Sequence, residues 1–260
     1  MANRVLAIVV AISGFIGALH AQQYCNPSYC TGNRVNVGCN PPPLTGGPNC
    51  ATKSPSVVDL NATYQNIILS QHNGLRSQLA IGNLTGFAPA NRMPTLSWDN
   101  ELAAQAGNNA RSCNFAHDAC RNTAVYAWAG QNIAITSFYG MTKTVETLIT
   151  DMTKRWWDEY KITLQSFVDA YPRNYTGPAI GHFTQMASDR SSKIGCAMQY
   201  WLAGIWNNYY LVCNYGVTNV LDRAVYKKGA TASLCTTGVN PNIPGLCSVN
   251  ENVPALPNDP

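Results

Sequence analysis

The sequence lacks the short motifs that mark the common nucleotide-binding and hydrolytic enzymes. Its 260 residues contain neither a Gly-x-Gly-x-x-Gly fingerprint nor a phosphate-binding loop, and neither Gly-x-Ser-x-Gly nor His-Glu-x-x-His occurs. Each motif places a phosphate-binding backbone or a catalytic group at a defined point of a fold, so the most direct evidence for those enzyme classes is missing. No Cys-x-x-Cys pair occurs either, which argues against a zinc ribbon.

Long runs of basic residues and long apolar runs are also missing. Residues 1–21 are predicted to be a secretory signal, because Arg4 precedes an apolar run from Val5 to Ile16, and we place the cleavage after Ala21. Without the leader the chain keeps 16 basic and 13 acidic residues, a formal charge of +3, and no run of Lys or Arg exceeds two residues. We therefore expect no nucleic-acid partner. No later stretch approaches about 20 apolar residues, so we expect no transmembrane segment and a secreted, extracellular protein.

Cysteine is plentiful. All ten cysteines follow the leader, and an even number in a secreted chain favours five disulfides. Four of them lie in residues 22–56 among Pro, Gly and Asn, which predicts a loop-rich N-terminal extension without a core of its own. The principal domain is expected over 57–220. Residues 221–260 are expected to form an irregular tail with one disulfide loop.

Three Asn-x-Thr sequons predict N-linked sugar on a secreted chain. They begin at Asn61, Asn83 and Asn174, whereas the proline of Asn26-Pro-Ser excludes that site.

Apolar spacing predicts a mixed fold of helices and a small sheet. Steps of three and four residues indicate helices, and alternation indicates strands. We expect helices over 57–81, from an N-cap at Asp99, over 143–162 and over 178–187, and a strand over 130–136. His72 lies on the apolar stripe of the first helix, where a buried, hydrogen-bonded histidine is favoured over a ligand.

Two segments near the C-terminal end of the domain predict a disulfide-tied hairpin. If Cys196 and Cys213 are cross-strand partners, its centre lies between Gly204 and Ile205, beside turn-forming residues. Leu211, Cys213 and Tyr215 then share one face by the period of two. His182 lies on the segment that leads into this hairpin.

Two further residues stand out chemically. His117 lies between Cys113 and Cys120, where it is either a rigidly held site residue or a surface histidine beside Asp118. Glu159 is in line with the core-facing side of its helix, although an unpaired buried charge is costly. Either Glu159 lies at the solvent-exposed end of that stripe, or its carboxylate contacts a cation, a metal or a hydrogen-bonded histidine.

The motifs Gly-His182-Phe-Thr-Gln-Met, Ile-Gly-Cys196 and Leu-Val-Cys213-Asn-Tyr make the chain resemble the CAP superfamily, which comprises cysteine-rich secretory proteins, antigen 5 and pathogenesis-related proteins of group 1. His72-Asn-x-x-Arg76 and Gly-Gln-Asn132-Ile-Ala support the match, which covers about 57–220. The cysteine spacing of the extension resembles the insect antigen 5 branch. The resemblance implies an α+β fold, an α-β-α sandwich with a small antiparallel sheet between helical layers.

The resemblance also implies the disulfide pairing. The antigen 5 pattern carries over as Cys25–Cys39, Cys30–Cys120, Cys50–Cys113 and Cys196–Cys213, and leaves Cys235 with Cys247. Two of these bridges would attach the extension to the loop that carries His117.

The family has a cleft lined by two histidines and acidic residues, and this implies a metal site at His117, His182 and Glu159. Gln131 stands where most members have glutamate, and an amide is a poor ligand for zinc or copper. The chain therefore keeps a partial site for Zn or Cu. Ala187-Ser188 replaces the apolar residue and Trp usual after Met186, which predicts a more open, more polar cleft wall.

Two functions follow as expectations. The first is a monomeric, non-enzymatic effector or allergen of saliva or venom that binds an extracellular protein receptor or a small lipophilic ligand such as a lipid or eicosanoid. The alternative is a metal-dependent enzyme, a peptidase or a copper redox enzyme, that uses the His/Glu cleft. An ion-channel toxin is disfavoured, because only two cysteines follow the principal domain.

Overall fold

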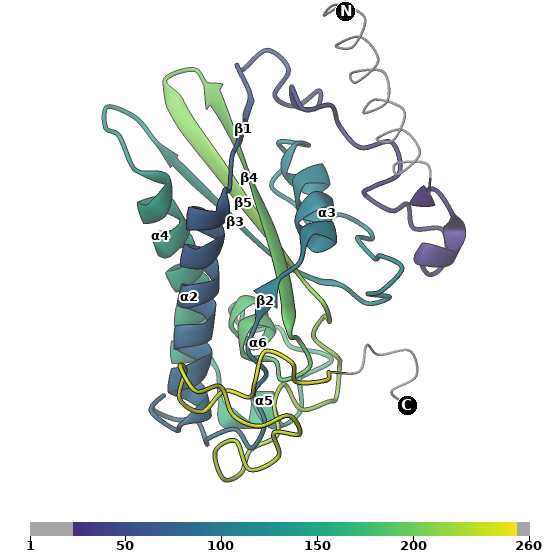
Figure 1. Ribbon diagram of the computed structural model, residues 1–260. Helices are drawn as coiled ribbons and strands as arrows, with labels where there is room; N and C mark the ends of the chain where they lie inside the picture. The colour runs from purple at the N-terminus through teal and green to yellow at the C-terminus, as the bar shows by residue number, and fades with distance from the viewer. Residues whose placement is uncertain (1–22, 254–260) are drawn as a thin grey trace, which may run out of the picture.

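The computed structural model describes residues 23–253 of the chain (Figure 1). The predicted secretory signal lies outside the described residues. The elements are η1 (Pro27–Tyr29), β1 (Ser56–Val58), α2 (Ala62–Ala80), β2 (Ser97–Trp98), α3 (Asn100–Ala110), β3 (Gly130–Phe138), α4 (Val145–Trp157), η2 (Asp158–Ile162), α5 (Gln165–Asp169), α6 (Gly181–Ala187), β4 (Lys193–Ala203) and β5 (Trp206–Tyr215). The predicted α+β class is confirmed.

A largely antiparallel sheet forms the centre of the fold. Its strands follow the order β1-β4-β5-β3, and the short β2 pairs in parallel with β4. Cys196 lies opposite Cys213, and Ala203 lies opposite Trp206, so the hairpin turns at Gly204 and Ile205 as predicted. Gly204 has a φ of 61°, a conformation that glycine adopts without steric cost.

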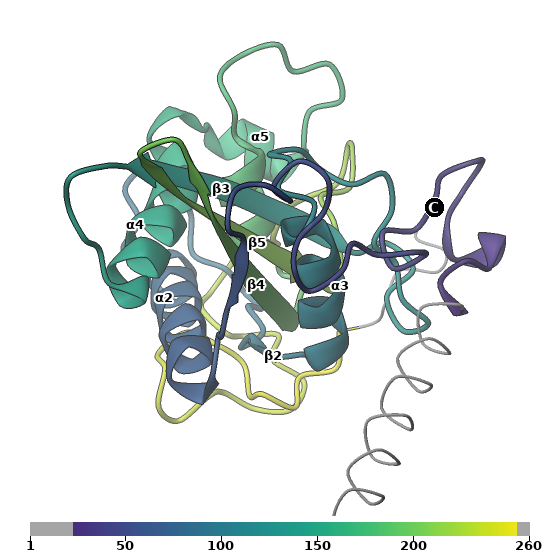
Figure 2. The same cartoon turned by 90° about the horizontal axis from the view of Figure 1, so that it is seen from above.

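Helices cover both faces of the sheet (Figures 1 and 2). Helices α2 and α4 pack against each other on one face, and α3 packs on β4 and β5 across the other. The alternation of β5 divides its side chains between two cores, since Leu211 belongs to the α2/α4 side and Val212 to the α3 side. The face predicted for Leu211, Cys213 and Tyr215 is confirmed, because all three lie in the larger core.

The helix boundaries show where tertiary pairing overrides local pattern. Asp99 caps α3 as predicted, its carboxylate accepting from the backbone N–H groups of Glu101 and Leu102. The first helix begins only at Ala62, because 56–58 pair with β4 as a strand. The helix predicted over 143–162 tightens into the 3-10 turn η2 after Trp157.

The five predicted disulfides are all present: Cys25–Cys39, Cys30–Cys120, Cys50–Cys113, Cys196–Cys213 and Cys235–Cys247. Two of them attach the extension to the loop after α3. The tail has no helix or strand over 221–253, yet Tyr226 and Leu246 are buried in the larger core. It is therefore packed into the domain.

The surface features follow from this packing. Asn61, Asn83 and Asn174 are all exposed, and Asn61 accepts through Oδ1 from two N–H groups that begin α2. Its Nδ2 stays available to a sugar, so capping and glycosylation are compatible; glycosylation itself stays a prediction. Within residues 23–253 no helix is long and apolar enough to cross a membrane.

Candidate functional site

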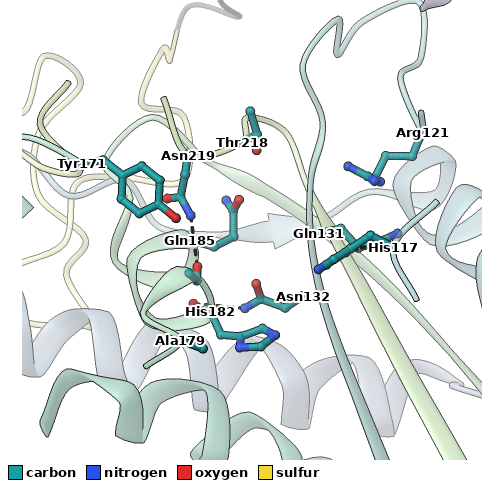
Figure 3. Close-up of a pocket in the computed structure, with 11 residues that line it drawn as sticks. His117, Arg121, Gln131, Asn132, Tyr171, Ala179, His182, Gln185, Thr218 and Asn219 are labelled. Carbon is teal, nitrogen blue, oxygen red and sulfur yellow. Dashed lines mark hydrogen bonds between the residues drawn. The ribbon is translucent and has the colours of Figure 1, made fainter. Parts of the chain in front are cut away.

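A cavity of about 450 Å³ lies between β3, α6 and the segment that follows β5 (Figure 3). Most of its lining side chains are polar. The lining residues are His117, Arg121, Gln131, Asn132, Tyr171, Ala179, Gly181, His182, Gln185, Thr218 and Asn219. The cavity thus brings together three of the four residues that the sequence proposes for a cleft, and the fourth, Glu159, lies directly behind it.

Glu159 accepts three hydrogen bonds, two from His182 and one from Phe183. Its Oε1 accepts from Nδ1 of His182 at 2.6 Å, and its Oε2 accepts from the backbone N–H groups of His182 and Phe183 at 2.8 and 3.1 Å. Of the alternatives for this carboxylate, the hydrogen-bonded histidine is the one that the structure shows. Because Nδ1 donates to the carboxylate, Nε2 of His182 is the nitrogen left for a ligand.

Gln131 orients the imidazole of His117 in the same way, by accepting from its Nδ1. Its Oε1 accepts from Nδ1 of His117 at 2.8 Å, and its Nε2 donates to Oδ2 of Asp118 at 2.7 Å and to Oδ1 of Asn214 at 3.0 Å. A carboxylate only accepts, so Asp118 determines which end of the amide faces it and which end faces His117. His117 is therefore held at the cavity, and its Nε2 is also left for a ligand.

The surroundings of His117 favour its neutral form. His117 is an exposed residue, but the partial loss of solvent around its ring lowers the pKa of the imidazole. Nearby Arg121 and His182 lower it further, and the hydrogen bond to Gln131 and the charge of Asp118 oppose them only in part. A neutral imidazole presents a lone pair at physiological pH, which suits it to metal binding or hydrogen-bond acceptance.

A buried hydrogen-bond chain supports the cavity from behind. Asn132 donates to the backbone oxygen of His182 at 3.1 Å and to Oη of Tyr215 at 3.2 Å. Oη of Tyr215 lies 2.9 Å from Nε2 of His72, and Nδ1 of His72 donates to the backbone oxygen of Ile68. The preferred structural role of His72 is confirmed, since it is fully buried with both ring nitrogens bonded.

Arg76 fixes the segment that follows α6. Its buried guanidinium donates to four backbone oxygens, those of Pro94, Met186, Ser188 and Ser191. This role was missed from the sequence, although Arg76 follows His72 by one helical turn on the same buried face. The expected opening at Ala187-Ser188 is wrong: both residues are buried and outside the cavity, because Arg76 draws this backbone inward.

Other lining residues carry no local signal in the sequence. Tyr171, Thr218 and Asn219 come from irregular segments that only the tertiary fold brings to α6 (Figure 3). Arg121 is held by Oδ1 of Asp118 at 2.8 Å. Among the described residues, no three His, Cys, Asp or Glu are grouped to hold a metal ion.

Comparison with known proteins agrees with the fold and with these motifs. The profile described as "CAP: Cysteine-rich secretory protein family" matches residues 69–215. Venom allergen-1 of Aedes albopictus is 45% identical over 254 residues, 97% of each chain. The antigen 5 like allergen Cul n 1 of Culicoides nubeculosus is 35% identical over 202 residues, which cover 74% of this chain and 90% of the relative. The chain belongs to the CAP family, and its relatives agree with the predicted antigen 5 branch.

A solved structure gives the same fold. The protein described as "Crystal structure of NaASP2 with Zn2+" aligns with a TM-score of 0.58 and 27% identity, over 71% of this chain and 94% of that chain.

Proposed function

We propose that this protein is a secreted, non-enzymatic antigen 5-like effector or allergen that binds an extracellular partner or small ligand through the His117/His182 cleft. One observation carries the proposal: each imidazole is bonded through Nδ1 to a fixed acceptor, Gln131 or Glu159, and so keeps Nε2 for a ligand. This arrangement orients two binding nitrogens without supplying a nucleophile.

A divalent ion fits the donor set of the cleft. His117 and His182 would hold Zn or Cu through Nε2, with water completing the shell. Glu159, which the sequence places among the ligands, has both oxygens bonded to His182 and Phe183 and would orient His182 from behind, as Gln131 would orient His117. Support comes from the solved relative described with Zn2+. Two protein ligands predict weaker binding than the three or four of dedicated zinc sites.

The lining disfavours the alternative of an enzyme. The residues that line the cavity include no Ser, Cys, Asp or Glu, and all ten cysteines are paired in disulfides. A peptidase that forms a covalent intermediate would need such a side-chain nucleophile, so the enzymatic alternative is left with water on an ion held by the two histidines. Thr218 is the one lining hydroxyl of an aliphatic side chain, and no imidazole hydrogen bond activates it.

The same lining bears on the class of ligand. A lipid or eicosanoid buries long apolar chains, whereas Ala179 and Gly181 are the only lining residues without a polar side chain. We therefore favour a protein receptor or a small polar ligand in this cleft.

Titration calorimetry with Zn²⁺ and Cu²⁺ tests the site. The wild type should bind one ion, and the double variant His117→Ala/His182→Ala should not bind it. Lys161→Ala, which replaces an exposed lysine of η2, serves as the control and should bind as the wild type does. Unchanged binding in the double variant would reject the assignment. A casein assay with and without metal tests the enzymatic alternative, which cleavage by the wild type but not by the double variant would support.

A further inference from the structure

A second cavity lies beside the cleft, and nothing so far explains it. It measures about 200 Å³, and its walls come from three segments distant in sequence: the extension at Thr31 and Arg34, residues 119–122 with 128–129, and Thr218. We call it the side pocket. Arg121 and Thr218 line both cavities, so the side pocket directly adjoins the cleft. In Figure 3 these two residues lie across the cleft from His182.

The walls of the side pocket are held in place before any ligand arrives. The disulfide Cys30–Cys120 joins the extension to the loop after α3. Asn122 donates to the backbone oxygen of Tyr29 at 2.8 Å and accepts from the N–H of Ala129 at 3.1 Å. The N–H of Thr218 donates to the backbone oxygen of Trp128 at 2.7 Å. A preformed pocket loses little conformational entropy on binding, which favours small ligands.

The two arginines of the side pocket differ in electrostatic state. Arg121 is paired with Asp118 and donates to the backbone oxygen of Ala129, so it adds N–H donors but little net charge. Arg34 is exposed, and within residues 23–253 no hydrogen bond or ion pair engages its guanidinium. No Asp or Glu is among the residues that line this pocket. An unpaired guanidinium beside such a surface attracts an anion, and its planar fork matches a carboxylate or phosphate.

Trp128 supplies the second recognition element. Trp128 lines the pocket and is 42% exposed, and it ranks among the exposed large apolar residues. An uncovered indole stacks favourably on a flat apolar ring. Its backbone is fixed by the bond to Thr218, which limits how far the ring can move away.

We propose that the side pocket binds a small ligand that carries an anionic group next to a flat ring. Arg34 holds the anion, Trp128 packs on the ring, and a longer ligand continues past Arg121 and Thr218 into the cleft. The inference does not rest on metal binding, because none of these residues contacts either imidazole through a hydrogen bond. It assigns to the disulfide-tied extension a direct part in ligand recognition.

The test compares two probes that differ in charge but hardly in shape, 2-naphthoate and 2-naphthamide. Equilibrium dialysis against the secreted, fully oxidised protein should show the carboxylate binding about tenfold more tightly or better, as expected for a hydrogen bond to a charged group. Arg34→Gln should remove this preference and leave amide binding unchanged. Trp128→Ala should weaken both probes.

Lys227→Gln is the matched control, because it removes one exposed positive charge outside both cavities. It should keep the preference for the carboxylate. No bond within residues 23–253 engages the guanidinium of Arg34, so the Arg34→Gln variant should retain the wild-type melting temperature. Equal affinities for the two probes, no binding at millimolar concentration, or an equal loss in Lys227→Gln would each overturn the proposal. Metal binding is read separately: His117→Ala/His182→Ala should lose the ion and keep the naphthoate preference.

Discussion

Nδ1 of His182 lies 2.6 Å from Oε1 of Glu159, and the other oxygen of the same carboxylate accepts from the backbone N–H groups of His182 and Phe183 in the first turn of α6. One side chain therefore determines both the direction of the imidazole and the start of the helix that carries it.

Glu159→Gln tests this dual role. An amide offers one acceptor oxygen, so either the imidazole or the two N–H groups lose their partner. We expect the affinity for Zn²⁺ to fall about 10- to 100-fold, as for other residues that orient metal-binding histidines. Calorimetric titration measures the change, with the exposed Glu146→Gln of α4 as control. An unchanged affinity in Glu159→Gln would contradict the orienting role.

Gln131→Glu should destabilise the protein, although glutamate is usual at this position in the family. The amide of Gln131 donates to Asp118 at 2.7 Å and to Asn214 at 3.0 Å. A glutamate carboxylate at this position could not donate, and its negative charge would lie against the negative charge of Asp118. We expect a loss of about 1–3 kcal/mol in unfolding free energy at pH 7. The loss should shrink toward pH 5, where one carboxyl takes up a proton and donates again.

Asp118→Asn in the same chain supplies the control for this prediction. It replaces the opposing carboxylate by a group that can donate, so Gln131→Glu/Asp118→Asn should recover part of the stability in urea titrations. If the single and double variants were equally unstable, repulsion between carboxylates would not be the cause.

His72 should make stability depend on pH. Burial lowers the pKa of this imidazole to about 4 from its ordinary value of 6.5. The unfolded chain therefore binds the proton more tightly, so this contribution is complete above pH 6.5 and is lost as pH falls toward 4. A difference of this size corresponds to about 3 kcal/mol. Guanidinium unfolding across this range should give a flatter curve for His72→Gln than for the wild type; parallel curves would reject the assignment.

Arg76→Met should be among the most damaging single substitutions. It leaves four carbonyl oxygens without their donor in the interior, and an unpaired buried acceptor typically costs about 1–3 kcal/mol. We expect a loss of at least about 3 kcal/mol in urea unfolding. Arg173→Met, which breaks an exposed pair with Asp222, should cost less than about 1 kcal/mol. Similar effects of the two substitutions would show that Arg76 does not anchor the segment after α6.

Much of the fold could be predicted from local pattern and from resemblance. The hairpin centred at Gly204, the N-cap at Asp99 and the burial of His72 follow from periodicity and from side-chain chemistry within a few residues. The five disulfides required the family resemblance, because ten cysteines by themselves allow many pairings. The start of α2 was placed too early, because the pairing of 56–58 with β4 depends on a strand more than 130 residues away.

The residue types available to the cleft can be read from the amino-acid sequence: two histidines, one carboxylate in an apolar stripe, and an amide in place of a second carboxylate. The role of each residue follows only from the folded arrangement. Glu159 accepts from Nδ1 of His182, and Gln131 accepts from Nδ1 of His117. The orientation of the Gln131 amide follows from Asp118, which accepts from its Nε2. Such roles depend on which donor meets which acceptor within about 3 Å, and only packing of segments distant in the sequence brings those atoms together.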